Sequence, residues 1–287
     1  MTICALCNYI AFLALSFIAL TYAGRISLDE LESISGGEGI NGRIVGGKVV
    51  DIRKHPHQIS LRQRPKYSED QSTYAHNCGG TIYTDRIVIT AGHCLYDRVK
   101  EQLMVVAGAN ERSSVDGAIS PVQEIIMHEE YNDDYSYNDI ALLVLTTPLP
   151  INNVSIKAAT LTEVQPQHGD IATITGWGTL SSGGSLPDLL QEVQVPIVSN
   201  EICSQRYPRR ITDAMICAGL LDVGGKDACQ MDSGGPLLVH GQLAGVVSFG
   251  SGCALPQYPG VYANVWYFST WIREKAAQVE AKLLREN

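Results

Sequence analysis

Residues 232–236 read Asp-Ser-Gly-Gly-Pro, and two earlier stretches go with them: Thr-Ala-Gly-His-Cys at residues 90–94 and Asn-Asp-Ile-Ala-Leu at residues 138–142. Together they place a histidine, an aspartate and a serine in that chain order. A hydroxyl becomes an effective nucleophile when a base takes its proton and a third group holds the base in one orientation. The three residue types supply these parts, and their chain order is one of those used for such a triad.

Each of the three residues, taken alone, also has a purely structural interpretation. His93 follows an apolar run and could cap or pack against a strand, and Asp139 precedes a second apolar run and could begin one. Ser233 stands before two glycines and could occupy a turn. Only their joint occurrence favours catalysis.

The composition is that of a globular protein with an acidic surface. The 287 residues are 45% hydrophobic and 18% charged, and the formal net charge is −9. This length suits a single all-β unit of two barrels, and it is sufficient to bury a hydrophobic core. A negative surface repels phosphates, which argues against nucleic acid and anionic membranes as main partners.

The N-terminus carries an apolar segment over residues 9–20, which is short for a membrane-spanning helix. A small-residue cleavage site ends at Ala23, so residues 1–23 are expected to be a signal peptide and the mature protein to be secreted and extracellular. No Lys or Arg precedes the apolar segment, and an uncleaved membrane anchor is the alternative. Residues 24–43 contain a Gly-rich stretch and no cysteine, which predicts a flexible, protease-accessible segment.

The cysteine count agrees with export. Two of the eight cysteines lie within the expected signal peptide, and an even set of six remains, for which fifteen pairings are open. Their spacing contains no pattern typical of a zinc site. The sequon that begins at Asn153 is a candidate glycosylation site. The six cysteines are Cys78, Cys94, Cys203, Cys217, Cys229 and Cys253.

Many short β-like runs separated by turns predict a barrel or a sandwich. A single helix is expected at the C-terminus, where Ser269 could cap an amphipathic stretch. The polar stretch over residues 62–76 contains a proline and is expected to be an exposed loop. The expected strands are 58–61, 86–90, 103–107, 140–145, 172–175, 243–249 and 260–265.

From residue 44 to about residue 273, the chain resembles the trypsin branch of the chymotrypsin-like serine proteases, and insect trypsins in particular. The three motifs carry this resemblance, with Arg-Ile-Val-Gly-Gly at 43–47, Gly-Trp-Gly at 176–178 and Pro-Gly-Val-Tyr at 259–262. It implies an all-β fold of two six-stranded antiparallel β-barrels, with the active site between them and a C-terminal α-helix. It also implies a protease domain over residues 44–287 and the disulfides Cys78–Cys94, Cys203–Cys217 and Cys229–Cys253.

The resemblance assigns the catalytic roles residue by residue. Ser233 attacks the scissile carbonyl, His93 takes and returns the proton, and Asp139 orients His93. The backbone N–H groups of Met231 and Ser233 form the oxyanion hole. No cofactor is implied, and Glu111 with its neighbours makes a poor calcium site, so no metal is expected.

The resemblance also implies the substrate class. Asp227 matches the carboxylate at the base of the primary specificity pocket, which selects Arg or Lys before the cut bond. Gly250 and Gly260 match wall positions that leave room for a long side chain. Ser248 and Gly250 match the segment that pairs with the substrate backbone. Protein inhibitors are further expected partners, and the enzyme is expected to be a monomer.

Activation is implied by the bond between Arg43 and Ile44, which ends a propeptide over residues 24–43. Cleavage there by an activating trypsin-like protease frees the α-amino group of Ile44, and that group is expected to pair with Asp232 and to order the site.

Three positions depart from the family pattern. Met231 stands where the family has glycine, Gly92 stands where alanine is usual, and Phe249 stands where tryptophan is usual. Met231 keeps its N–H, and its side chain could point towards the leaving-group side of the site. Alternatively the peptide could flip and remove one oxyanion donor, since glycine tolerates backbone angles that other residues resist. The competing functions are therefore an active endopeptidase and a catalytically impaired homologue that acts as a binding protein.

Overall fold

The computed structural model describes residues 44–64, 73–208 and 210–286. These residues belong to one unit over Gly42–Asn287. The expected signal peptide, the expected propeptide and Arg43 lie outside the described residues.

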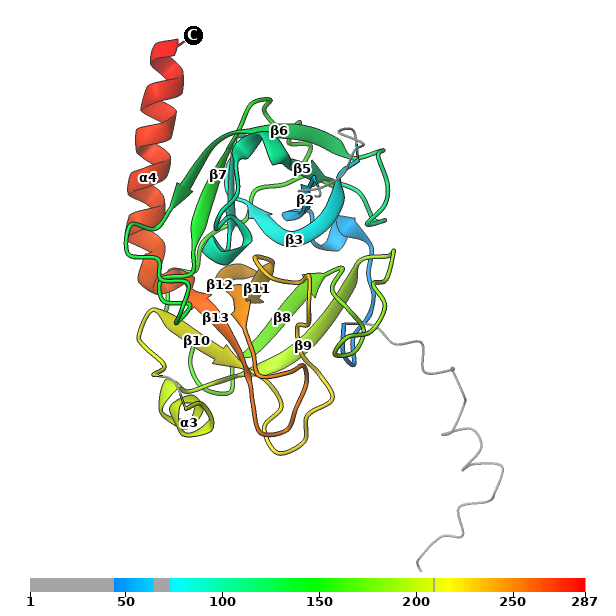
Figure 1. Ribbon diagram of the computed structural model, residues 1–287, viewed down its shortest axis with the longest axis vertical. Helices are drawn as coiled ribbons and strands as arrows, with labels where there is room; N and C mark the ends of the chain where they lie inside the picture. Colours follow the sequence, from blue (N-terminus) through cyan, green and yellow to red (C-terminus); the bar gives the residue numbers. More distant parts are fainter. Residues whose placement is uncertain (1–43, 65–72, 209, 287) are drawn as a thin grey trace, which may run out of the picture. The chain divides into compact units, whose positions relative to one another are not determined.

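Six antiparallel strands close the first barrel in the order β2-β3-β4-β7-β6-β5 (Figure 1). Its interior is filled by β-branched and leucine side chains, and every residue of β4 and β7 is buried. The strands are β2 (Gln58–Gln63), β3 (Ala75–Ile82), β4 (Ile87–Thr90), β5 (Leu103–Ala107), β6 (Ala118–Met127) and β7 (Ala141–Leu145).

Six further antiparallel strands form the second barrel in the order β9-β10-β13-β12-β11-β8, which closes through pairing of β8 with β9. The short strand β1 (Lys48–Val49) adds to the open side of β9. The predicted fold of two six-stranded barrels is thus confirmed. The strands are β8 (Ile171–Gly176), β9 (Gln191–Val198), β10 (Met215–Ala218), β11 (Pro236–Val239), β12 (Gln242–Phe249) and β13 (Gly260–Asn264).

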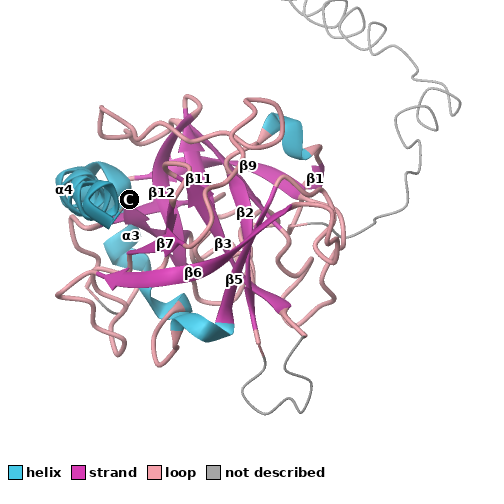
Figure 2. Cartoon of the chain, turned by 90° about the horizontal axis from the view of Figure 1, so that it is seen from above, coloured by secondary structure: helices cyan, strands magenta, loops and turns pink. Residues whose placement is uncertain are grey.

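The C-terminal helix α4 (Val265–Glu286) runs along the edge of the barrels (Figures 1 and 2). It begins four residues earlier than predicted, directly after β13, so the expectation that Ser269 caps it is wrong. Asn264 supports the first turn instead, because its Oδ1 accepts a hydrogen bond from the Tyr267 N–H at 3.4 Å. The expectation of a single helix is wrong, because α3 (Asn200–Arg206) is a second one, capped by Ser199. The remaining helical segments are η1 (Ile52–Lys54), η2 (Gly92–Cys94) and η3 (Lys100–Gln102).

The expected loop over residues 62–76 is shorter than predicted, since β2 and β3 both extend into it. Arg62 is 4% exposed rather than solvated. Its guanidinium donates to the carbonyl oxygens of Arg112 and Ser114, which compensates the burial of the charge. Residues 65–72 of this stretch lie outside the described residues.

The barrels touch where the serine motif lies. Thr175 Oγ1 in the second barrel donates to Gln58 Oε1 in the first at 2.6 Å, and both residues are fully buried. The Gly79 N–H of β3 donates to the Ser233 carbonyl at 2.7 Å. A Cβ on Gly79 would stand 2.8 Å from Gly235 Cα, so glycine is what permits this approach.

Candidate active site

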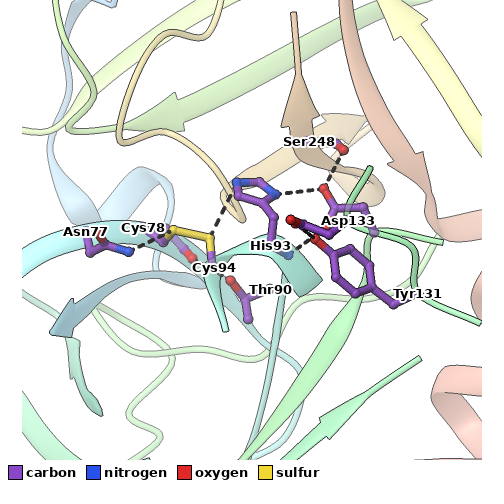
Figure 3. Close-up of polar contacts among 10 residues, drawn as sticks. Asn77, Cys78, Thr90, His93, Cys94, Tyr131, Asp133 and Ser248 are labelled. Carbon is purple, nitrogen blue, oxygen red and sulfur yellow. Dashed lines mark hydrogen bonds and ion pairs between the residues drawn. A yellow bond between two sulfur atoms is a disulfide. The ribbon is translucent and has the colours of Figure 1, made fainter. Parts of the chain in front are cut away.

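The histidine and aspartate motifs meet because their strands pair. η2 follows β4, Asp139 stands just before β7, and the register aligns Thr90 with Ala141. His93 Nδ1 lies 2.8 Å from Asp139 Oδ2, and the His93 N–H donates to Asp139 Oδ1, also at 2.8 Å. Figure 3 shows the surroundings of His93, with Ser248 on one side and the Cys78–Cys94 disulfide on the other. One carboxylate therefore fixes both the backbone and the ring of the histidine. Its bond to Nδ1 favours the tautomer that leaves Nε2 free to accept a proton.

Asp139 is 2% exposed, and a third donor satisfies it. Ser248 Oγ in β12 donates to Asp139 Oδ2 at 2.5 Å. Burial by itself would lower the pKa of His93, but the hydrogen bond and charge of Asp139, with a smaller contribution from Asp133, raise that pKa above its usual value. The pair is therefore built to stabilise a protonated imidazole.

Ser233 is held in the turn before β11 at the boundary of the barrels. Gly234 takes φ +78°, and a Cβ there would overlap Thr90 Oγ1 and the Gly79 backbone. Ser233 Oγ makes no hydrogen bond with His93 among the described residues. Such contacts are often long before substrate binds. His93 Nε2 lies 3.9 Å from Cys94 Sγ of the neighbouring disulfide.

Met231 takes φ +73° and its side chain is 37% exposed. This left-handed conformation suits glycine, so methionine bears some backbone strain here. The N–H groups of Met231 and Ser233 have no acceptor within the described part of the chain. The nearby Asp232 N–H, in contrast, donates to the Cys229 carbonyl at 3.0 Å. Two neighbouring donors are thus left for an oxyanion.

His76 anchors Met231, and sequence reasoning missed it. His76 Nε2 donates to the Met231 carbonyl at 3.0 Å, while Nδ1 lies 2.8 Å from Ser60 Oγ. Burial lowers the pKa of His76 to about 4, so the ring is neutral at physiological pH. No motif marks this residue, because the contact arises only when β2 and β3 reach the turn of the other barrel.

A cavity of about 160 Å³ opens beside Ser233 and contains Asp227 among its lining residues. Asp227 is 4% exposed; its Oδ2 accepts from the Ala254 N–H at 3.0 Å, and its Oδ1 has no partner in the described structure. Burial raises the pKa of Asp227 to about 7. A buried carboxylate with an unsatisfied oxygen is stabilised by an incoming cation.

The other residues expected at this cavity also line it: Ser248, Gly250 and Gly260. A Cβ on Gly260 would stand 2.8 Å from Asp227 Oδ1, so any larger residue would obstruct the carboxylate. A Cβ on Gly250 would meet only the Gly252 carbonyl, at 3.4 Å. Gly260 therefore has the stricter steric requirement.

Asp232, next to Ser233, is fully buried. Its oxygens accept from the Gly178 N–H at 2.7 Å and the Cys229 N–H at 2.9 Å. It forms no ion pair with any described residue, and burial raises its pKa to about 7. A side chain at Gly178 would overlap the carboxylate, which accounts for that glycine. Ile44 is also fully buried, in the core of the second barrel.

The disulfides are Cys78–Cys94, Cys203–Cys217 and Cys229–Cys253, the pairs that the resemblance implied. The first brings two sulfurs close to His93, but both sulfurs are bonded to each other and cannot serve as thiolate ligands of a metal.

Comparison with known proteins agrees with this geometry. A family model described as Trypsin matches residues 44–272. The chain belongs to the trypsin family. Trypsin zeta of Drosophila melanogaster is 48% identical over 270 residues, which make up 92% of this chain and 94% of the relative. Trypsin eta of the same species is 46% identical over 82% of this chain and 89% of its own length. Trypsin alpha-4 of Lucilia cuprina is 42% identical over 84% and 90%, respectively.

This member of the trypsin family is accordingly a trypsin-like serine endopeptidase, a hydrolase whose substrates are proteins. No helix within the described ranges is long and apolar enough to cross a membrane. Asn153 lies in an exposed turn at φ +57°. Asn152 Oδ1 shapes this turn by accepting three N–H groups, from Val154 to Ile156.

Proposed function

We propose that this chain is a secreted endopeptidase, made as an inactive precursor, that cuts peptide bonds after Arg or Lys. Residues 1–23 are removed on export, and residues 24–43 are removed on activation. The observation that carries the Arg and Lys specificity is the unpartnered Oδ1 of Asp227 in the cavity beside Ser233. Asn153 is exposed and is a candidate site for glycosylation, and no cofactor is assigned.

The proposed mechanism uses the bonds described above. Ser233 Oγ attacks the carbonyl carbon as His93 Nε2 takes its proton. Asp139 holds Nδ1–H at 2.8 Å and balances the positive charge of the imidazolium. His93 then gives the proton to the leaving amine, which departs and leaves an acyl group on Ser233. Water attacks this acyl-enzyme as His93 takes its proton. That proton returns to Ser233 Oγ when the bond to the acyl group breaks, and the carboxylic acid product leaves.

The oxyanion is stabilised by the N–H groups of Met231 and Ser233. Support comes from the absence of a described acceptor for either group. The Thr179 N–H also donates to the Gln230 carbonyl at 2.8 Å, which fixes the peptide that carries the Met231 N–H. A flipped peptide that lost one donor would slow catalysis by about 10²–10³-fold. The positive φ of Met231 is the one observation that favours the impaired homologue. The N–H groups of Met231 and Ser233, which have no described acceptor, favour the active enzyme.

Activation follows from the buried state of Asp232. Cleavage after Arg43 by another trypsin-like protease gives Ile44 a charged α-amino group. We assign Asp232 as its partner, because Asp232 is an ionisable group in a closed site that has no described cation. The ion pair would fix the turn that carries Ser233 and Met231, which is an order–disorder switch.

Active-site labelling tests the proposal. The secreted product is sequenced from its N-terminus, cleaved after Arg43, and treated with a fluorophosphonate that carries an Arg-like cation. Mass spectrometry should find the adduct on Ser233, strongly increased by cleavage and lost in His93→Ala. An Asp227→Ser variant should react with an uncharged fluorophosphonate but lose its preference for the cationic one. Equal labelling of Ser233 before and after cleavage, and by the cationic and uncharged probes, would refute the proposal.

A further inference from the structure

A cavity of about 310 Å³ is lined by residues of both barrels and shares no lining residue with the Asp227 cavity. Its walls come from the segment between η1 and β2, residues 157–160, β8, and the turn that joins β11 to β12. A buried water needs about 10–15 Å³, so a small molecule has room here. The residues that matter below are Lys54, His55, His57, Lys157 and Thr173.

Backbone hydrogen bonds hold these walls in place. The Lys157 N–H donates to the Pro56 carbonyl at 2.9 Å, which joins two of the segments that line the cavity. The Leu243 N–H donates to the Thr160 carbonyl at 2.8 Å, which ties residues 157–160 to the second barrel. The cavity is therefore formed by the fold itself, and a ligand would enter it with little rearrangement.

The charge of this cavity is positive. Lys54 and Lys157 are both exposed, both line it, and neither forms an ion pair with a described residue. No Asp or Glu is among the described lining residues. Two ammonium groups thus share one hollow in a chain whose formal net charge is −9.

The two carboxylates on adjoining segments are bonded to other cations. Asp51 interacts electrostatically with the lysine of η1, but its Oδ2 accepts a hydrogen bond from Arg53 Nη2 at 2.6 Å. Glu192 lies 2.7 Å from His55 Nε2 and 3.1 Å from Lys48 Nζ. The positive charge of the cavity is therefore left without a dedicated carboxylate.

His57 adds a polar atom that the fold leaves unsatisfied. It lines the cavity and is 8% exposed, and its Nε2 is buried with no hydrogen-bond partner in the described structure. Burial, with smaller contributions from His55 and Lys157, lowers the pKa of His57 to about 3, so the ring is neutral at physiological pH. A neutral imidazole carries one N–H, which either ring nitrogen can hold. His57 can therefore donate one hydrogen bond to a ligand.

An anion fits these groups better than a metal ion. The described part of the chain has no cluster of three metal-ligating side chains at this cavity, and two ammonium groups repel a cation. An oxyanion with several oxygens can accept from both lysines and from a neutral imidazole. Thr173 Oγ1 already accepts from Gln194 Nε2 at 3.4 Å, which leaves its hydroxyl hydrogen to be donated as well.

We propose that this cavity binds a phosphate or sulfate group, held by Lys54 and Lys157 with His57 and Thr173 as neutral donors. The group arrives either as the free ion or on a small polar molecule. The site is separate from the Asp227 cavity and does not depend on the proposed catalytic function. Because its walls come from both barrels, a bound ligand stabilises the folded chain.

Isothermal titration calorimetry on the full chain tests this site, with Ser233→Ala present to prevent self-cleavage. The ligands are inorganic phosphate and glucose 6-phosphate, and chloride keeps the ionic strength constant. We expect one site per chain, with the affinity reduced about 3- to 10-fold in Lys54→Gln and in Lys157→Gln, as for the loss of one solvated charge. The matched control Lys100→Gln, an exposed lysine that lines neither of these cavities, should bind like the parent.

His57→Phe removes the ring nitrogens and should weaken binding further, and thermal unfolding without ligand shows whether this variant is folded. The two lysine variants change only exposed side chains, so the test stands without it. Tighter binding of glucose 6-phosphate would identify the carried group as the ligand, and equal binding would identify the free ion. No binding of either ligand, equal affinities in the parent and both lysine variants, or binding of Zn²⁺ with no response to phosphate would overturn the assignment.

Discussion

At the scale of single residues, the local chemistry of the site depends on how each buried carboxylate is satisfied. The Asp139 carboxylate accepts hydrogen bonds from three donors, and both of its oxygens are satisfied. Asp227 has an unpartnered oxygen, and Asp232 has two backbone donors but no described cation. The first carboxylate has all its hydrogen bonds, whereas we propose that the other two receive a cationic partner, one from the substrate and one from the new N-terminus.

Asp227 predicts a pH dependence of cation binding. Its pKa is raised to about 7 in the free enzyme, and a bound amidinium stabilises the ionised form. Binding below pH 7 must therefore displace a proton, so affinity should fall by about tenfold per pH unit below 7 and level off above it. Calorimetry with an aromatic amidine in a His93→Ala background, where His93 cannot titrate, measures this. Affinity that is flat from pH 5 to 8 would contradict the account.

Ser248 predicts a loss of rate through Asp139. Ser248→Ala removes the 2.5 Å bond to the carboxylate that orients His93. A hydrogen bond to a charged group contributes about 1.5–3 kcal/mol, so we expect kcat on an Arg amide to fall about 10-fold or more. Ser185→Ala, an exposed serine with no described side-chain hydrogen bond, is the control. Equal kcat values for the two variants would show that Asp139 does not need this donor.

At the scale of elements, local sequence predicts the strands that are apolar and bounded by turns, such as β4, β5 and β7. It misses β3, whose Gly79 and Gly80 have low β-propensity and are held in the strand by tertiary contacts. It also misses β9, where Val193, Val195 and Ile197 alternate with exposed or half-buried residues. The predicted start of α4 was wrong because β13 passes into the helix without an intervening loop.

The same limit applies to the site. The positions of His93, Asp139 and Ser233 can be predicted because each stands in a short motif, and Asp227 because of its distance from Ser233 in the chain. His76 cannot be predicted in this way. Its role depends on contacts between separate strands and turns, and no spacing in the sequence encodes it.

Asn264 gives a prediction at the junction of β13 and α4. It is 1% exposed, its Nδ2 donates to the Asp213 carbonyl at 3.0 Å, and its Oδ1 accepts from the first turn of the helix. Asn264→Ala should lower the free energy of unfolding by about 1–3 kcal/mol, because buried backbone groups lose their partner. Denaturant unfolding measures this. The control Gln278→Ala, on the exposed face of α4, should change it by less than about 0.5 kcal/mol.

At the scale of the whole molecule, the proposed activation would couple a cut in the chain to the stability of the site. In the uncleaved chain the pKa of Asp232 is raised to about 7, above its unfolded value of about 3.9. The stability that the protonated form contributes is full below the unfolded pKa and is lost as pH rises through 7. We propose that the Ile44 ammonium compensates the carboxylate in the cleaved chain. Such pairing would raise the ammonium pKa above its free value of about 7.7–8.0, so this stabilisation would be lost only at alkaline pH.

These two pH dependences predict a limited pH range in which cleavage stabilises the chain most. With Ser233→Ala present to prevent self-cleavage, the Tm of the cleaved chain should exceed that of the uncleaved chain most between about pH 7 and 8. The difference should be smaller near pH 4, and smaller again at alkaline pH. Asp227 is present in both forms of the chain, so its titration does not contribute to the difference in Tm. A Tm difference that does not change with pH would show that Asp232 and Ile44 do not pair. The control Asp232→Asn should abolish this pH dependence.

The central claim is that Met231 keeps its N–H in the oxyanion hole, so that this chain is an active member of its family. The most direct measurement is a burst titration of the cleaved enzyme with an Arg ester, beside a Met231→Gly variant. The account predicts a near-stoichiometric burst in both, with acylation rates that differ by less than about tenfold. An absent or much slower burst in the parent, restored by about 10²–10³-fold in Met231→Gly, would show that the peptide has flipped and would contradict it.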